Sequence, residues 1–251
     1  MIVRQFLKWI QTAPPGERAD ATSALARAYL YADLSSGDRM AAEAAMTVLL
    51  DDPSPQVRRS LAEAIATSEY APRTVLIGLC QDQLDIAEII VERSPALLDV
   101  ELVDLAATGK ERLQIAIASR EMLSRSVAAA VAEVGSAAAC LALLENPAAD
   151  LTGATLSRIA ERYGHLAVVR DDLLSRDDLP TETRQALVAT LADTLARFVT
   201  HKEWLPEDRA KSVAREACDR ATVAIGSIGT HGERYWWKDA PCVLGTPPVG
   251  K

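Results

Sequence analysis

The chain has 251 residues, enough for one large domain or two small ones and too many to depend on disulfide bonds. Hydrophobic residues make up 49% of the chain but aromatic residues only 4%, so small aliphatic side chains dominate and favour helices. The formal net charge of −8 repels phosphate backbones at long range and makes nucleic acid a poor default partner. The four cysteines are far apart, which is typical of reduced thiols in a cytoplasmic protein.

The first predicted elements are two helices within residues 2–32, separated by the helix breakers Pro14-Pro15-Gly16. We expect residues 1–35 to cap the N-terminal end of the structure. No signal peptide is expected in this region, because no long apolar run precedes a cleavage site. No later stretch has the 18 or so apolar residues of a membrane span.

Residues 36–176 are predicted to form repeated helix pairs. After residue 49 one helix ends in Leu-Leu-Asp, a turn with Pro53 and Pro55 follows, and the next helix begins before Val57. This sequence motif resembles the junction between the two helices of a HEAT repeat. Weaker copies follow at intervals shorter than the ~40 residues of a standard HEAT repeat, which predicts helices of two to three turns. The positions that correspond to Val57 are Ile86 and Ile115, and two further copies lie around Ala138 and around Ala167.

Glycines mark several of the predicted helix ends. Gly109, Gly135 and Gly164 each follow an apolar-periodic segment, at a place where a left-handed residue commonly ends a helix. No segment alternates polar and apolar residues as a strand would, and no hairpin turn signal occurs. The sequence therefore predicts an all-α protein, a HEAT-like α-solenoid of short antiparallel helix pairs with N- and C-terminal capping helices.

Residues 177–225 are predicted to form a pair of long helices that caps the C-terminal end. The helices cover 181–200 and 206–225, and each has an apolar face. Glycine and proline become frequent afterwards, so residues 226–251 are predicted to be an irregular tail. The two apolar faces consist of Leu187, Leu191, Leu195 and Phe198 in the first helix and of Val213, Ala217, Ala221 and Ala224 in the second.

Four short sequence motifs in the central region resemble those of a known family. They lie at 94–99, 114–120, 143–149 and 176–180. In their order and spacing they resemble a bacterial family of domains of unknown function, family 2336 (DUF2336), over residues 45–225. The resemblance implies a helical HEAT-like fold and supplies no functional residues. The tail after Ile225 is expected to lie outside the family.

No residue pattern predicts catalysis, a metal site or a cofactor. His165, His201 and His231 have no partner at metal-ligand spacing. The Gly-x-Ser-x-Gly motif of a nucleophilic serine is absent as well. Cys80 and Cys140 are expected inside helices, where a thiol is a poor nucleophile. The sequence therefore predicts a protein without enzymatic activity, cofactor or metal.

Arginines recur in or next to the second helices of the predicted pairs, where they could hold an acidic peptide or a phosphate backbone through bidentate contacts. In the alternative interpretation, Arg59 pairs with Glu63 in its own helix and the others bridge acids of neighbouring repeats. Acids such as Glu88 and Glu92 in these helices favour that alternative. The candidate arginines are Arg58, Arg59, Arg93, Arg120, Arg162 and Arg170.

Aromatic residues in the tail form a second candidate site, Tyr235-Trp236-Trp237 with Lys238. If exposed, these side chains could stack on bases, insert at a membrane interface or anchor in a groove of a partner. If they fold back onto the last helices, they would instead complete the core. The sequence leaves both interpretations open.

A long helical surface without a catalytic pattern predicts a non-enzymatic adaptor or regulatory module in the cytoplasm, which binds a protein partner along the solenoid. The first alternative is a HEAT-like nucleic-acid-binding protein similar to a DNA glycosylase, which the acidic composition disfavours. The second alternative is a HEAT-like enzyme or carrier for a small ligand or pigment. Such a protein requires a deep apolar pocket with a few polar groups.

Overall fold

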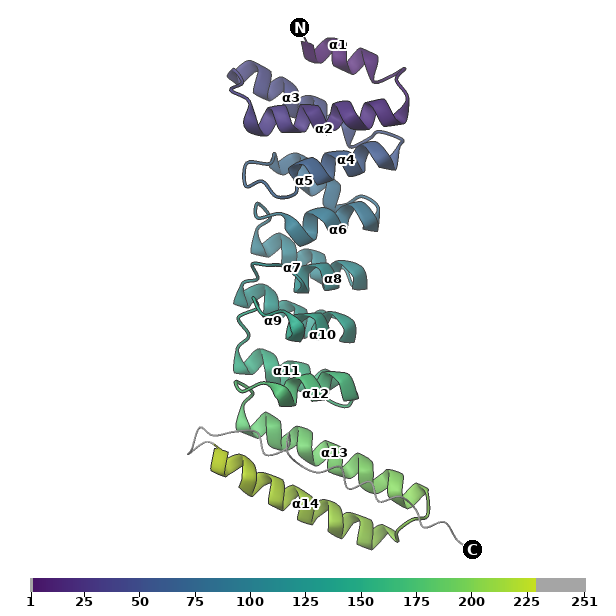
Figure 1. Cartoon of the computed structure of the whole chain (residues 1–251), viewed down its shortest axis with the longest axis vertical. Coiled ribbons are helices and arrows are strands. Elements are labelled where there is room, and N and C mark those ends of the chain that lie inside the picture. Colours follow the sequence, from purple (N-terminus) through teal and green to yellow (C-terminus); the bar gives the residue numbers. More distant parts are fainter. Residues whose placement is uncertain (1, 229–251) are drawn as a thin grey trace, which may run out of the picture. The chain divides into compact units, whose positions relative to one another are not determined.

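The structure is a computed structural model that describes residues 2–228 (Figure 1). All regular elements in this range are α-helices, α1 to α14, and the only pairing of extended residues is an isolated bridge between Leu123 and Ala149. The predicted all-α class is confirmed. The chain divides into two compact units, Met1–Pro180 and Thr181–Lys251.

The first unit contains the helices α1 to α12. The predicted break at Pro14-Pro15 separates the first two of them, and α4 to α12 have 8 to 11 residues each, which is the predicted two to three turns. The bounds are α1 Ile2–Trp9, α2 Pro15–Tyr31, α3 Ser36–Leu49, α4 Pro55–Ile65, α5 Arg73–Cys80, α6 Leu84–Arg93, α7 Asp99–Ala107, α8 Glu111–Ala118, α9 Arg125–Val134, α10 Ala137–Glu145, α11 Gly153–Tyr163 and α12 Ala167–Ser175.

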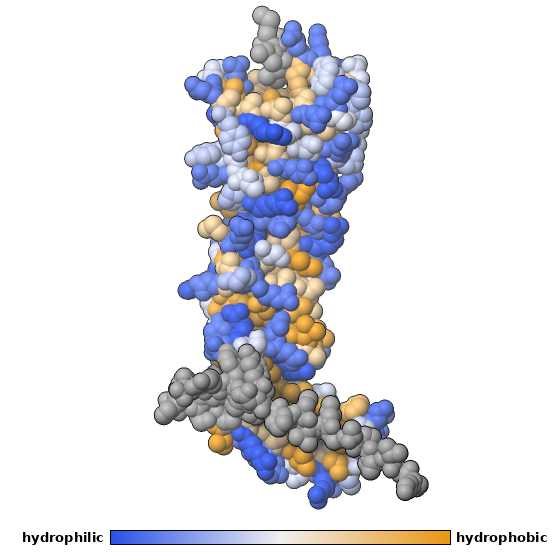
Figure 2. Space-filling view, viewed as in Figure 1, coloured by the Kyte–Doolittle hydropathy of each residue, from blue (hydrophilic) through white to orange (hydrophobic). Residues whose placement is uncertain are grey.

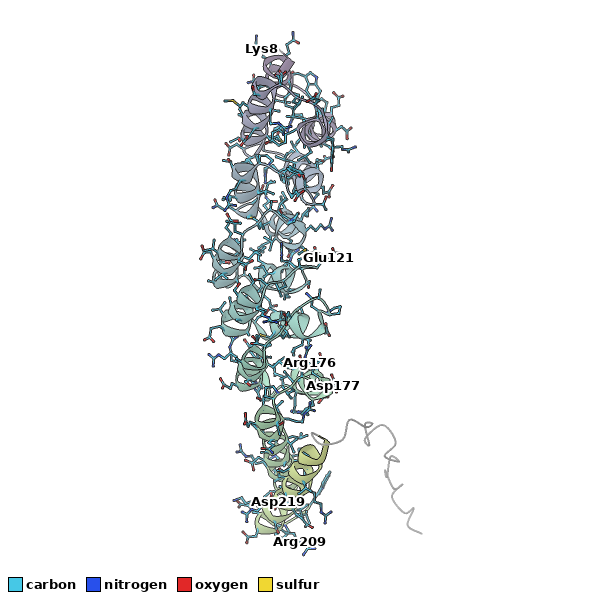
Figure 3. All side chains as sticks on the ribbon, turned by 90° about the vertical axis from the view of Figure 1, so that its left-hand side faces the viewer. Lys8, Glu121, Arg176, Asp177, Arg209 and Asp219 are labelled. Atoms are coloured by element: carbon cyan, nitrogen blue, oxygen red, sulfur yellow. The ribbon has the colours of Figure 1, made fainter. Side chains whose placement is uncertain are left out.

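These helices form two rows. In the even row, α2 packs on α4, and α6, α8, α10 and α12 follow in chain order. In the odd row, α1 packs on α3, α3 on α5, α7 on α9 and α9 on α11. In Figure 3 the helices of the first unit are seen roughly along their axes, and the two rows run side by side, with the even row on the side of Glu121 and Arg176. Each connection therefore carries the chain from one row to the other.

Two apolar positions recur in the even row from α4 onward, the third and the seventh residue of each helix. Residues i and i+4 share one face of a helix, so these positions line the space between the rows. All ten side chains are at most 2% exposed. The pairs are Val57 and Leu61, Ile86 and Ile90, Leu113 and Ile117, Ala139 and Leu143, and Val169 and Leu173.

The predicted repeat phase was correct at Val57 and Ile86 and wrong at the three later positions. Ile115 is only partly buried and Ala138 and Ala167 are exposed, because the core positions of α8, α10 and α12 lie one or two residues away. From α4 onward, the even-row helices begin 29, 27, 26 and 30 residues apart, so the connections differ in length. A repeat of fixed length therefore misplaces the buried positions of the later helices. The error is not visible in the sequence, because most residues around these positions are aliphatic as well.

The glycines end their helices in different ways. Gly109 follows α7 with φ +73°, which is the predicted left-handed conformation. The same prediction is wrong for Gly135 and Gly164, whose φ angles are −66° and −62°. Gly135 is needed for a different reason, because a Cβ there would clash with the carbonyl oxygen of Val131.

The second unit contains a hairpin of two long helices, α13 (Thr181–His201) and α14 (Glu207–Ile228). The helices predicted over 181–200 and 206–225 are thereby confirmed. In the turn between them, Glu203 has a φ of 58°. The two helices pack on each other, and the buried side chains among the described residues of the hairpin are Leu187, Ala196 and Ala210.

Candidate interaction surface

Arg58 on α4 is engaged within the first unit. Its Nε and Nη2 donate to the two carboxylate oxygens of Asp82 at 2.6 and 2.9 Å, and Nη1 donates to the carbonyl oxygen of Asp52 at 2.6 Å. The side chains of Arg58 and Asp82 are only 11% and 10% exposed. Because Asp82 lies between α5 and α6, this bidentate pair joins one helix pair to the next.

The ionised form of Asp82 is stabilised by this pair. Burial favours the protonated acid, but hydrogen bonds from Arg58 and the Gln83 N–H, together with the charge of Arg58, outweigh it and lower the pKa of Asp82. Because the pKa of Asp82 is lower in the folded state than in the unfolded state, ionisation of this carboxyl group adds to the free energy of unfolding. The contribution is complete above about pH 4 and is lost as the pH falls through the folded-state pKa.

We therefore expect the effect of Asp82→Asn to depend on pH. The substitution should lower the free energy of unfolding by about 1–3 kcal/mol at pH 7 and by less at pH 2–3, as the pH approaches the lowered pKa of the wild-type acid. Urea denaturation at both pH values measures the difference, with the exposed Asp51→Asn as control. An equal loss at both pH values would contradict the role assigned to the charge.

Arg120 is buried, with 6% of its surface exposed, and caps a helix of the preceding pair. Nη1 donates to the carbonyl oxygen of Val91, and Nη2 donates to that of Ser94 at 2.6 Å. Both carbonyls lie at the C-terminal end of α6, where a cation also suits the helix dipole. One pair later, Asn146 donates to the carbonyl oxygens of Ala118 and Arg120 at 2.7 and 2.8 Å.

Arg162 and Arg170 are also held within the first unit. Arg162 donates to the carbonyl oxygen of Ala132 at 2.7 Å, and its guanidinium lies 4.7 Å from the ring centroid of Tyr163. The side chain of Arg170 is 12% exposed and lies beside Asp171. These two arginines therefore resemble Arg58 and Arg120 in having little surface to offer a partner.

Arg59 and Arg93 are the more accessible of the predicted arginines. Arg59 pairs with Asp85 on α6 and not, as the alternative interpretation expected, with Glu63 on its own helix. The side chain of Arg93 is 55% exposed, and its contact with Glu92 is 4.0 Å. Partner binding by this set remains a prediction, and Arg59 and Arg93 are its most accessible members. The predicted site at Tyr235, Trp236, Trp237 and Lys238 lies outside the described residues.

The even row has an outer surface formed by the second and fifth residues of its helices, which lie away from the buried third and seventh. From α4 to α8 most of these positions carry charges, and Arg59–Asp85 and Arg112–Glu88 pair across neighbouring helices. We call Arg59, Asp85, Glu88 and Arg112 the charged stretch. These surface pairs neutralise Arg59 and Arg112, of which only Arg59 is one of the arginines singled out from the sequence.

The character of this surface changes at α10, which has no charged residue before Glu145. Ala138 and Val168 are exposed, Val168 to 59%, and the other members of the patch are partly exposed. Figure 2 shows more apolar surface over α8–α12 than over α2–α6 on this face. We call this patch the apolar stretch, consisting of Ile115, Ala138, Leu141, Ala142 and Val168.

A groove of about 370 Å³ lies between α2 and α4 in the same row. Its lining is mainly polar and includes Arg27, Tyr31, Ser60 and Glu63. A small apolar ligand would bury little surface in such a groove, so it is unlike the site required by a pigment-handling protein.

Within residues 2–228, the side chains that could bind a metal ion do not cluster, and Cys80 and Cys140 are buried. No group of three or more His, Cys, Asp or Glu residues in this range could hold a metal ion. Burial raises the pKa of the Cys80 thiol to about 12 and that of Cys140 to about 11, so both are protonated at neutral pH. Each helix that the structure describes is too short or too polar to cross a membrane.

The helices of the first unit define a protein built by stacking short helices in two rows. Residues 86–235 match the model of a family described as "Uncharacterised protein conserved in bacteria (DUF2336)", and the chain belongs to this family. No curated protein and no solved structure matches the chain. The predicted family is confirmed, but the match extends to Tyr235, so the expectation that the tail after Ile225 lies outside it was wrong.

Proposed function

We propose that the chain is a HEAT-like α-solenoid that acts as a non-enzymatic adaptor or regulatory module in the bacterial cytoplasm. It binds a segment of a protein partner along the outer surface of the even row. The two rows of short helices, with successive even-row helices 26 to 30 residues apart from α4 onward, support the solenoid assignment. Helices α1 and α2 act as the N-terminal cap of this array.

The apolar stretch is the observation that carries this proposal. At the second and fifth positions, α4 and α6 carry the charged residues Arg59, Asp85 and Glu88. At the same positions α10 presents Ala138 and Leu141, and α12 presents Val168 and the exposed acid Asp171, which lies at the border of the apolar stretch. Contiguous exposed apolar side chains with a polar border mark interaction sites, because their burial by a partner removes them from water. The charged stretch beside them forms the border.

The complementary partner is an amphipathic helix or an extended segment with apolar side chains at its centre. Its apolar side chains bury the apolar stretch, and its polar side chains lie toward the charged stretch. The apolar contact supplies most of the affinity, while the ion pairs select the partner and its orientation.

A nuclease-treated pull-down from a native lysate tests this assignment. The intact chain is compared with Ala138→Glu/Val168→Glu, which places two charges in the apolar stretch at exposed positions. The matched control is Gln56→Glu/Thr67→Glu, which adds the same charge at exposed positions on or beside α4. We expect a protein that the intact chain and the control retain and the Ala138 variant loses.

Two results would contradict the proposal. Equal retention by both variants would place the binding surface elsewhere on the molecule. Recovery of nucleic acid without nuclease, with no retained protein and with binding that collapses at moderate salt, would establish the nucleic-acid alternative instead.

A further inference from the structure

The α13–α14 hairpin leaves large apolar side chains in solvent. Leu195 and Phe198 on α13 are 53% and 48% exposed, and Val213 on α14 is 52% exposed. Trp204 in the turn is 68% exposed and contacts Phe198 edge-on, with ring centroids 5.8 Å apart. Two helices alone bury only the line along which they meet, so an exposed set of this size needs a further element.

The two flanks of the hairpin differ in character. One flank contains a polar groove lined by side chains that include Asp193, Arg197 and Lys211. At 100° per residue, Leu195 and Phe198 lie on the side of α13 opposite to Asp193 and Arg197. By the same geometry, Val213 lies on the side of α14 opposite to Lys211, so these apolar side chains share the second flank.

The apolar side chains of this flank lie side by side across the two helices. Because the helices are antiparallel about the turn at 202–206, Leu195 is level with Val213, and Leu191 is level with Ala217. Figure 2 shows apolar side chains along this hairpin. We call this strip the apolar flank, consisting of Leu191, Leu195, Phe198, Val213 and Ala217.

We propose that the chain's own C-terminal segment, residues 229–251, covers the apolar flank, with Trp236 and Trp237 seated against Leu195, Phe198 and Val213. The aromatic rings supply the apolar surface that the strip lacks, and two adjacent tryptophans bury several hundred square ångströms, at ~150–250 Å² each. This inference concerns the second unit and is independent of the function proposed for the even row.

The length of the segment fits this position. Val213 lies 15 residues before Ile228, which is about 22 Å along α14. Tyr235 to Trp237 follow Ile228 by 7 to 9 residues, and an extended chain of that length spans up to about 23–32 Å. A chain that turns back at Ile228 therefore brings the rings level with Val213 and Leu195.

Two further observations favour the segment over a separate molecule. It is attached at the end of α14, so its effective concentration at the flank is about millimolar, far above that of a free partner or second copy at ordinary concentration. The family match also continues to Tyr235, seven residues beyond the last residue of α14. The first aromatic residue of the segment thus belongs to the family domain.

Hydrogen exchange of the full chain, followed by mass spectrometry, tests the proposal. In Trp236→Ala/Trp237→Ala, we expect amides of residues 187–217 to exchange at least tenfold faster than in the wild type. Exchange in α4–α8 should stay unchanged and shows that the first unit remains folded. The matched control, Tyr31→Ala/Tyr70→Ala, removes two rings that are 75% and 70% exposed in the first unit and should leave α13 and α14 unaffected.

Coupling between the two sides identifies the contact itself. Phe198→Ala alone should accelerate exchange in the same residues, and combining it with the tryptophan substitutions should add little, because both remove one interaction. Unchanged exchange in the tryptophan variant would overturn the proposal. Protection that depends on protein concentration and not on the tryptophans, with a dimer in sedimentation, would assign the flank to a second copy.

Discussion

Replacing Ile117 by alanine is expected to lower the free energy of unfolding by about 2–4 kcal/mol, whereas Ile115→Ala should cost about 1 kcal/mol or less. Both residues lie on α8, two positions apart in the sequence. Ile117 has no exposed surface and belongs to the buried seventh positions of the even row, whereas Ile115 is partly exposed on its outer surface. Only the first substitution opens a cavity between the two rows.

Urea denaturation of the two variants, followed by circular dichroism, measures this difference. The comparison is well matched because the same side chain is truncated to the same residue in the same short helix. It also distinguishes the repeat phase of the structure, with Ile117 at a buried position, from the phase predicted from the sequence, in which Ile115 corresponds to Val57. Equal losses, or a larger loss at Ile115, would contradict the packing of the even row described above.

Arg120→Met is expected to lower the free energy of unfolding by about 3 kcal/mol. Methionine keeps the apolar stem but removes both donors, so the carbonyl groups of Val91 and Ser94 remain buried without these partners. The end of α6 also loses a cation that suits its dipole. The loss should appear in the thermal midpoint as well, at about 2–4 °C per kcal/mol for a chain of this size.

Arg93→Met is the control for this substitution. Arg93 lies at the end of the same α6 but is 55% exposed, so its replacement should change the free energy of unfolding by less than about 0.5 kcal/mol. A large loss in both variants would indicate that arginine near this helix end matters through charge alone. A negligible loss in Arg120→Met would contradict the capping role.

The helices of the fold were predictable because local signals agree with one another. Proline at 14–15 and 53–55 ends or begins helices in the sequence and in the structure. The two long C-terminal helices followed from the period of their apolar residues. These apolar faces are covered only in part, however, since Leu187 is buried whereas Leu195 and Val213 are about half exposed. Periodicity defines a face but not what covers it.

The roles of the arginines were not predictable from spacing. Arg58 and Arg59 are neighbours in sequence, yet the first is nearly buried against Asp82 and the second lies on the surface beside Asp85. A helix turns by 100° per residue, so adjacent residues have different surroundings. Without the correct phase of each helix, inward and outward arginines could not be separated.

The apolar stretch was missed because its residues look like ordinary helix core. The segment 137–144 consists of Ala, Cys and Leu only, and its composition does not indicate which side faces solvent. The one signal in the sequence is the absence of charge through this segment, where a helix with one exposed face normally carries some. Alignment of the even-row helices by their buried positions then identifies Ala138 and Leu141 as outward.

The most direct test of the proposed function is the Kd of the purified partner for the doubly substituted chains. We expect Ala138→Glu/Val168→Glu to weaken binding at least tenfold, or about 1.4 kcal/mol, because it places charge within a buried apolar contact. Gln56→Glu/Thr67→Glu should leave the Kd within about threefold. Unchanged affinity in the first variant, or equal weakening in both, would contradict a docking surface on the apolar stretch.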